Sequence, residues 1–154
     1  MQKFAEDAAD FAGRLLIGLT FIYWGGRKLV DVLGPGAPDN GGWTAYMEAR
    51  GVAGGLLPVV IATEIGFGLM LVLGYRTRIA AIALAGFCLL ANVFFHSNFA
   101  LPAPAGHFNW IVFIKNLALA GGLLTIAGRG PASWSADSRW RSKDGSARLA
   151  SDAR

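Results

Sequence analysis

Four long apolar runs constrain this chain more than any other feature. They lie at about residues 11–30, 52–75, 79–101 and 109–127, and each is near the ~20 residues that a helix needs to cross the hydrocarbon core of a bilayer. Because a bilayer offers backbone groups no water, its spans are helices or closed barrels. The alternation of apolar and polar residues that marks a membrane barrel is missing from the sequence. The runs therefore predict an all-α integral membrane protein, a four-helix bundle.

The distribution of charge divides the chain into two parts. Only 16% of the residues are charged and 54% are apolar, whereas an ordinary soluble domain carries roughly 25% charged residues. We expect residues 1–128 to form the membrane domain and residues 129–154 to form a polar cytoplasmic tail, disordered toward its end. The first run begins after acidic residues and lacks a small-residue cleavage site, so we interpret it as a retained span.

Lysine and arginine placement predicts the orientation. Four crossings put both termini and the 75–78 turn on one side, and ten of the fourteen Lys and Arg residues lie there. The positive-inside rule then places both termini in the cytoplasm of a multi-pass protein of the bacterial inner membrane. The same bias explains the net charge of +4, so we expect membrane lipid as a partner and no nucleic acid.

Several polar side chains interrupt the apolar runs. Such groups cost ~2.5 kcal/mol or more on insertion scales and usually face the protein interior, where they mark function. We estimate the depth of each residue along its span from a helical rise of ~1.5 Å per residue. The estimates place these residues in one layer between the middle of the bilayer and its outer face. The members of this layer are Arg27, Lys28, Glu64, Asn92, His96, Lys115 and Asn116. We predict a common interior pocket in which Lys115 either pairs with Glu64 or presents its positive charge to a ligand.

Each of these residues also fits a structural role. A salt bridge that fixes helix register explains Glu64 and Lys115 as well as a ligand site does. The other ionisable residues also fit a position at the membrane interface. Arg14, Arg27 and Lys28 would extend their charged ends to the membrane surface, and His96 would contact water there.

Several chemistries find no support in the sequence. Cys88 is the single cysteine, which excludes a dithiol relay within the chain. His96 and His107 are the two histidines, and no residues cluster at metal-ligand spacing, so we expect no metal and no haem. A glycine-rich phosphate loop and a nucleophile elbow are both missing.

Four segments in order resemble the DoxX family of small four-helix membrane proteins, over about residues 11–137. They are RLLIGLTFIYWGGRKL at 14–29, EIGFGLMLVLGYRTR at 64–78, the pair Lys115-Asn116 followed by Gly121-Gly122, and GPASWSAD at 130–137. The last departs from the family pattern, because Ala132 stands where a second glycine is usual.

This resemblance implies a quinone-linked redox system. Family relatives include membrane subunits of sulfur-compound:quinone oxidoreductases and proteins linked to redox-stress complexes. On this reading quinone is the cofactor and a soluble or membrane redox protein is the partner. The expected catalytic residues are Glu64, Lys115 and His96, and the expected ligand-binding residues are Arg27, Lys28, Asn92 and Asn116.

Two other functions stay open. The four helices fit a non-catalytic module that holds a partner enzyme at the membrane through the 31–51 loop and the basic tail. Passage of a small molecule along the polar layer is the other, although four short helices give little room for alternating access unless the protein forms a homo-oligomer.

Overall fold

The described part of the chain is built from helices. The computed structural model describes residues 1–33, 42–130 and 133–140, and these residues contain no strand. The all-α prediction is confirmed there. The elements are α1 (Gln2–Leu33), α2 (Gly42–Glu48), the 3₁₀ turn η1 (Gly54–Leu56), α3 (Leu57–Leu73), α4 (Thr77–Ala91), the π-helical turn η2 (Asn92–His96) and α5 (Ala105–Arg129). Residues 136–140 form a last short helix.

Three helical stretches in the described residues are long and apolar enough to cross a membrane. They are Gly54–Leu73, Thr77–His96 and Ala105–Arg129, with mean hydropathies of 2.2, 2.1 and 1.8. They match the last three predicted spans, although the middle stretch ends at His96 rather than at residue 101. Helix α1 is longer, at 32 residues, but Arg14, Arg27 and Lys28 interrupt its apolar part, and it is not among the three.

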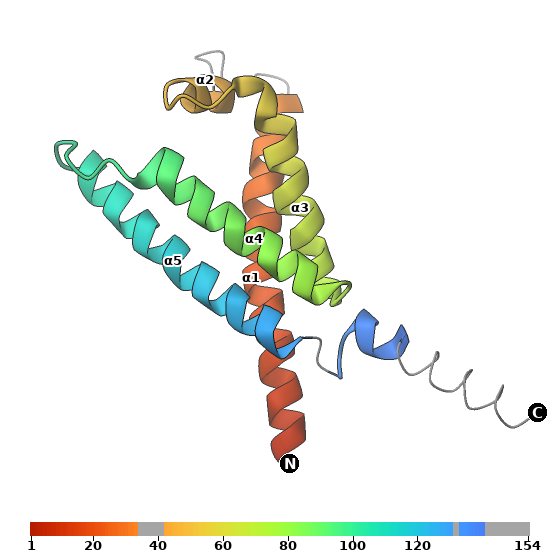
Figure 1. The fold of residues 1–154 in the computed structure, drawn as a ribbon. Helices are drawn as coiled ribbons and strands as arrows, with labels where there is room; N and C mark the ends of the chain where they lie inside the picture. The colour runs from red at the N-terminus through yellow and green to blue at the C-terminus, as the bar shows by residue number, and fades with distance from the viewer. Residues whose placement is uncertain (34–41, 131–132, 141–154) are drawn as a thin grey trace, which may run out of the picture.

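The long helices pack as two antiparallel pairs, α1 with α3 and α4 with α5 (Figure 1). The second pair is inclined to the first and crosses it near the turn that joins α3 to α4. Helix α5 packs mainly on α4 and touches α1 only slightly. The short helix α2 and the start of α5 lie at the opposite end of the molecule from this turn.

Glycines set the close approach of α1 and α3. A Cβ added to Gly18 would lie 2.9 Å from the carbonyl oxygen of Gly68, and one added to Gly68 would lie 3.1 Å from that of Gly18. Seven residues further along α1, a Cβ on Gly25 would lie 2.7 Å from Ile65. Small residues let membrane helices pack backbone against backbone, so this pair is held by a glycine face on α1.

Alanine and leucine side chains form the core between the two pairs. Its fully buried leucines are Leu71, Leu84 and Leu123, and small residues of α4 and α5 fill the space around them. Ala81 and Ala85 are buried. Ala118 and Gly121 are exposed instead, because the face of α5 that carries them points away from the rest of the protein.

Arg14 is fully buried (0% exposed) at the end of the molecule near the α3–α4 turn. Its Nε donates to Asp10 Oδ2 (2.7 Å), its Nη2 to the carbonyl oxygen of Trp134 (2.7 Å) and its Nη1 to that of Leu71 (3.3 Å). The interpretation that Arg14 snorkels to the interface is therefore wrong. The last carbonyls of a helix have no partner within it, and a guanidinium group carries five donors that can satisfy them.

Asp137 caps the start of α4 from outside the helix. Its carboxylate accepts hydrogen bonds from the backbone N–H groups of Arg76 (2.7 Å) and Thr77 (2.9 Å) and from the Thr77 hydroxyl (2.9 Å). Its own N–H donates to the carbonyl oxygen of Gly74 (3.0 Å). Residues 133–140 thus pack back onto the membrane domain, whereas residues 141–154, where we predict disorder, lie outside the described residues.

Candidate functional site

The predicted polar layer is divided between the two helix pairs. Lys28 and Glu64 meet between α1 and α3, and Asn92 and Asn116 meet between α4 and α5. Lys115 joins neither group. The described residues therefore do not form the single pocket that the sequence predicts.

Lys28 and Glu64 form a buried salt bridge. Lys28 Nζ lies 2.7 Å from Glu64 Oε1 and 2.8 Å from Oε2, so it contacts both carboxylate oxygens. The side chains are 12% and 5% exposed. Gly25 makes room for the pair, because a Cβ there would lie 3.0 Å from Glu64 Cβ. Each charge offsets the cost of removing the other from water.

Lys115 is exposed on α5 and makes no ion pair within the described residues. The predicted Glu64–Lys115 pair is therefore wrong. Helical periodicity places Lys115 about 100° from Asn116 around α5, and Asn116 points inward to α4. The lysine consequently points outward, and the ammonium group of α1 takes its place beside Glu64.

Helix α2 covers the Lys28–Glu64 pair. Lys28 Nζ lies 5.0 Å from the ring centroid of Trp43, within cation–π range, and Trp43 Nε1 donates to Asp31 Oδ2 (3.1 Å). Met47 of α2 is buried with residues of α3 in a second apolar cluster. Arg27 stays largely exposed, with Nη2 3.9 Å from Asp31, so it is the part of the predicted layer that fits snorkelling best.

Two asparagines link α4 to α5. Asn116 Nδ2 donates to Asn92 Oδ1 (2.9 Å), and Asn92 Nδ2 donates to the carbonyl oxygen of Phe113 (3.0 Å). Asn92 is 2% exposed. Both polar ends of Asn92 are thereby satisfied, which a buried amide requires. These two residues hold the helix pair together, and the Asn92 amide is occupied at both ends.

His96 ends the π-helical turn η2 and lies half-buried. Its Nδ1 is buried and has no hydrogen-bond partner among the described residues. Single π-turns occur often at functional sites, and a buried polar atom without a partner calls for an explanation. Among the predicted site residues that the structure describes, His96 is the one with a buried side-chain nitrogen that lacks a hydrogen-bond partner.

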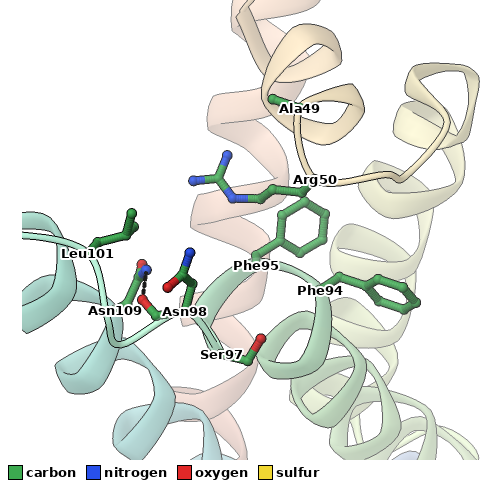
Figure 2. Close-up of a pocket in the computed structure, with 8 residues that line it drawn as sticks. All are labelled: Ala49, Arg50, Phe94, Phe95, Ser97, Asn98, Leu101 and Asn109. Carbon is green, nitrogen blue, oxygen red and sulfur yellow. Dashed lines mark hydrogen bonds between the residues drawn. The ribbon is translucent and has the colours of Figure 1, made fainter.

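A pocket of about 390 Å³ lies beside this turn (Figure 2). It is lined from three directions, by the end of α2, by the residues around His96 and by the start of α5. Its polar lining consists of Arg50, Ser97, Asn98 and Asn109, and its apolar lining includes Phe94, Phe95 and Leu101. Asn109 Nδ2 donates to the carbonyl oxygen of Asn98 (2.9 Å), which fixes the chain as it leaves η2.

An aromatic stack positions Arg50 at the pocket. The Arg50 guanidinium carbon lies 3.6 Å from the ring centroid of Tyr46, and Arg50 Nη1 donates to the Tyr46 carbonyl oxygen (3.2 Å). The Tyr46 ring stacks in turn on Phe95 at 5.6 Å and 8°. Figure 2 shows Arg50 reaching from the end of α2 toward Asn98 and Asn109. The guanidinium is thereby held over the pocket, and among the described residues only Nη1 has a hydrogen-bond acceptor.

The sequence alone did not identify Arg50, Asn98 and Asn109 as site residues. Ser97 and Asn98 fall inside the predicted 79–101 span, although two polar residues directly after His96 and shortly before Pro102 indicate that the helix has ended. Arg50 lies near the end of the amphipathic stretch WTAYMEARG at 43–51, whose two aromatic residues were the signal for a packed helix. Within the described ranges, no three His, Cys, Asp or Glu side chains gather to hold a metal ion.

Comparison with known proteins gives consistent matches. The DoxX model matches residues 9–97, and the SURF4 family model matches residues 55–142. The chain is 39% identical over 135 residues to the inner membrane protein YqjF of Escherichia coli, which covers 88% of this chain and 94% of YqjF. It is 30% identical over 128 residues to the inner membrane protein YphA of the same organism, covering 82% and 86%. No solved structure matches.

The relatives and the three membrane-length helices place the chain in the inner membrane as a multi-pass protein. The DoxX match covers more than half of the chain, and the YqjF match nearly all of it. The segments that carried the resemblance at 14–29 and 64–78 both fall within the matched range. The chain therefore belongs to the DoxX family.

Proposed function

We propose that α1 is a fourth membrane span and that both termini lie in the cytoplasm. The charges that interrupt α1 are compatible with a bilayer, because Arg14 is buried against Asp10 and carbonyl groups and Lys28 is buried against Glu64. Arg27 lies near the end of the helix, where snorkelling is favourable. A C-terminal fusion should then be fluorescent with green fluorescent protein and inactive with alkaline phosphatase, and the reverse result would contradict the topology.

We further propose that the protein is the membrane subunit of a quinone-linked redox system and holds the quinone headgroup in the pocket beside His96. The observation that carries this proposal is the lining of the pocket, which sets hydrogen-bond donors against apolar side chains. A volume of about 390 Å³ falls within the roughly 300–1,000 Å³ of small-molecule sites. A quinone needs this combination, since its two carbonyl oxygens accept hydrogen bonds while its ring and tail are apolar.

The residues suit distinct roles toward such a ligand. Arg50 and Asn109 supply N–H donors from opposite walls of the pocket. Phe94 and Leu101 are exposed and offer an apolar exit for the isoprenoid tail. His96 does not itself line the pocket, but its side chain interacts with Asn109, which does. We therefore assign the proton route to His96. Glu64 and Lys28 act in this scheme as the ion pair that fixes α1 against α3, and Asn92 and Asn116 fix α4 against α5.

The proposed redox reaction needs a partner subunit as its source of electrons. Reduction of one quinone to the quinol takes up two electrons and two protons. With quinone bound, a partner that oxidises a reduced sulfur compound would supply both electrons, and His96 would pass the protons from water. The chain itself contributes the binding, the orientation and the proton route.

Binding of a short-chain quinone tests the proposal. Decylubiquinone is titrated into the purified protein in detergent, and quenching of tryptophan fluorescence is recorded. We expect saturable binding that Arg50→Gln and Asn109→Leu each weaken about tenfold, which corresponds to about 1.4 kcal/mol. Arg27→Gln is the matched control, because Arg27 lies at the same end of the molecule and does not line the pocket. Absence of saturable binding, or equal binding by all variants, would refute the site.

A non-catalytic assembly module is the second candidate, and the closed Lys28–Glu64 pair favours it. Neither residue lines the pocket, and α2 covers them, so the deepest charges serve the fold rather than a ligand. On this reading a partner enzyme keeps its membrane-bound activity when Arg50 or His96 is replaced, provided that the protein is still inserted. Loss of that activity in Arg50→Gln with normal protein levels would favour the quinone site instead.

A further inference from the structure

Helix α5 carries a lysine, Lys115, near its middle, and no described residue forms an ion pair with it. Lys115 lies ten residues after Ala105 and fourteen before Arg129, so roughly 15 Å and 21 Å of helix separate it from the two ends of α5. Snorkelling to the membrane surface is a property of cations near helix ends. Lys115 is exposed and makes no ion pair with any described residue. Its ammonium group therefore faces the surroundings of the protein at mid-helix.

The face of α5 beside Lys115 is uncovered. Of the three membrane-length helices, α5 has the smallest buried share, 11% of its most apolar stretch against 28% and 33% for the others. Figure 1 shows it at the outer side of the α4–α5 pair. The apolar side chains of this face can pack against lipid. Acyl chains, however, offer the Lys115 ammonium group neither a hydrogen-bond acceptor nor an opposite charge.

The exposed positions along this face are spaced as in a helix–helix seam. They recur at intervals of three and four residues, the heptad spacing of left-handed helix pairs, and we call them the α5 seam: Ile111, Ile114, Ala118, Gly121, Thr125 and Gly128. A Cβ added to Gly121 or Gly128 would meet nothing within 4 Å. The seam narrows toward Arg129, where another helix can approach closely, and Lys115 flanks its wider half.

We propose that the α5 seam binds a membrane-spanning helix of a different protein, and that this helix carries an aspartate or glutamate that pairs with Lys115. The positive charge of Lys115 favours this partner over a second copy of the chain, because it needs a carboxylate opposite it. The three membrane-length helices contain one carboxylate, Glu64, and it is already bound to Lys28. Two copies that met symmetrically through this seam would bring two Lys115 side chains together. An acidic partner helix satisfies the charge and covers the seam.

Site-specific crosslinking in native membranes tests this proposal. A photoreactive benzophenone amino acid replaces Ala118 in the full chain, and as a control it replaces Ile82, which is also exposed but lies on α4. We expect the Ala118 position to give one protein adduct, with the crosslinked peptide in a membrane helix that has Asp or Glu within one turn. Lys115→Met should lower the yield about tenfold, while Lys115→Arg preserves it.

A charge exchange then identifies the pair. Lys115→Glu should abolish the adduct, and replacement of the partner's acidic residue by lysine should restore it. Adducts with lipid alone, with a second copy of the chain, or with yields that Lys115→Met leaves unchanged would each overturn the proposal. Insertion of every variant is checked by its monodisperse elution in mild detergent. The test is independent of the quinone site, because Lys115 does not line that pocket.

Discussion

Lys28 of α1 contacts both carboxylate oxygens of Glu64 of α3, at 2.7 and 2.8 Å, in the interior of the protein. This contact adds an ion pair to the glycine packing that joins α1 to α3. It also decides which lysine neutralises Glu64. Helix–helix pairing here is therefore partly ionic, and its strength can be measured by removing one partner at a time.

Removal of either partner of this ion pair should destabilise the protein strongly. Glu64→Gln and Lys28→Met each leave a buried charge uncompensated, which typically costs about 3–5 kcal/mol. The double variant Lys28→Met/Glu64→Leu should recover most of the loss, because no charge then remains buried. Thermal unfolding in detergent, followed by tryptophan fluorescence, measures the change.

Lys115→Met is the control for that experiment. Because Lys115 is exposed and unpaired among the described residues, its replacement in the purified protein should change stability by no more than about 0.5 kcal/mol. Equal destabilisation by Lys115→Met and Lys28→Met would contradict the observed pairing.

The close approach of α1 and α3 makes Gly18 intolerant of a side chain. In Gly18→Ala the new methyl group would lie 2.6 Å from Val72 Cγ2 and 2.9 Å from the carbonyl oxygen of Gly68, so the helices must separate, at a cost of about 1–3 kcal/mol. Gly13→Ala is the matched control on the same helix, because a Cβ there meets nothing within 4 Å. It should be neutral or stabilising, and unfolding midpoints that fall equally in both variants would argue against a tight crossing.

Loss of the Asp137 carboxylate should loosen the segment after α5. Asp137→Ala removes three hydrogen bonds from the start of α4, and loss of a cap costs about 0.5–2 kcal/mol. We expect faster tryptic cleavage after Arg139 in the intact, detergent-solubilised protein. Glu6→Ala removes an exposed carboxylate at the same end of the molecule and should leave the cleavage rate unchanged. The cap would be ruled out as the restraint if Asp137→Ala were cleaved at the wild-type rate.

Asn92 and Asn116 should couple measurably. Interhelical hydrogen bonds in membrane proteins average about 0.6 kcal/mol and reach about 1.7 kcal/mol. A double-mutant cycle with Asn92→Leu and Asn116→Leu should give a coupling energy in this range, and Thr125→Val serves as a control because its hydroxyl bonds only within α5. Strictly additive effects of the two asparagine substitutions would show that the 2.9 Å contact contributes nothing.

Much of the fold was predictable because membrane physics acts locally. Length and hydropathy alone located the spans that became α3, α4 and α5. Helical rise also put Lys28 near Glu64 and Asn92 near Asn116 in height, and these are the residues that meet. These features depend on a single segment and its solvent, so they need no knowledge of tertiary contacts.

The partners of the polar residues were not predictable in the same way. Helical periodicity tells which side chains share a face, but it does not tell which helix that face meets. Glu64 lies near both lysines in depth, and only the peripheral position of α5 turns Lys115 outward. The end of the third span was misjudged because the apolar run continues past His96 to Leu101, while the π-helical turn has already ended the helix.

The contact between Arg14 and the carbonyl oxygen of Trp134 joins residues 120 positions apart, and Asp137 reaches back 60 positions to Thr77. During translation, Arg14 and Thr77 are therefore synthesised well before Trp134 and Asp137, which bond to them. Until the last residues emerge, the guanidinium of Arg14 and the first N–H groups of α4 lack these bonds. Translation of residues 134–137 therefore completes this end of the protein, and a chain truncated after α5 would insert its helices without these contacts.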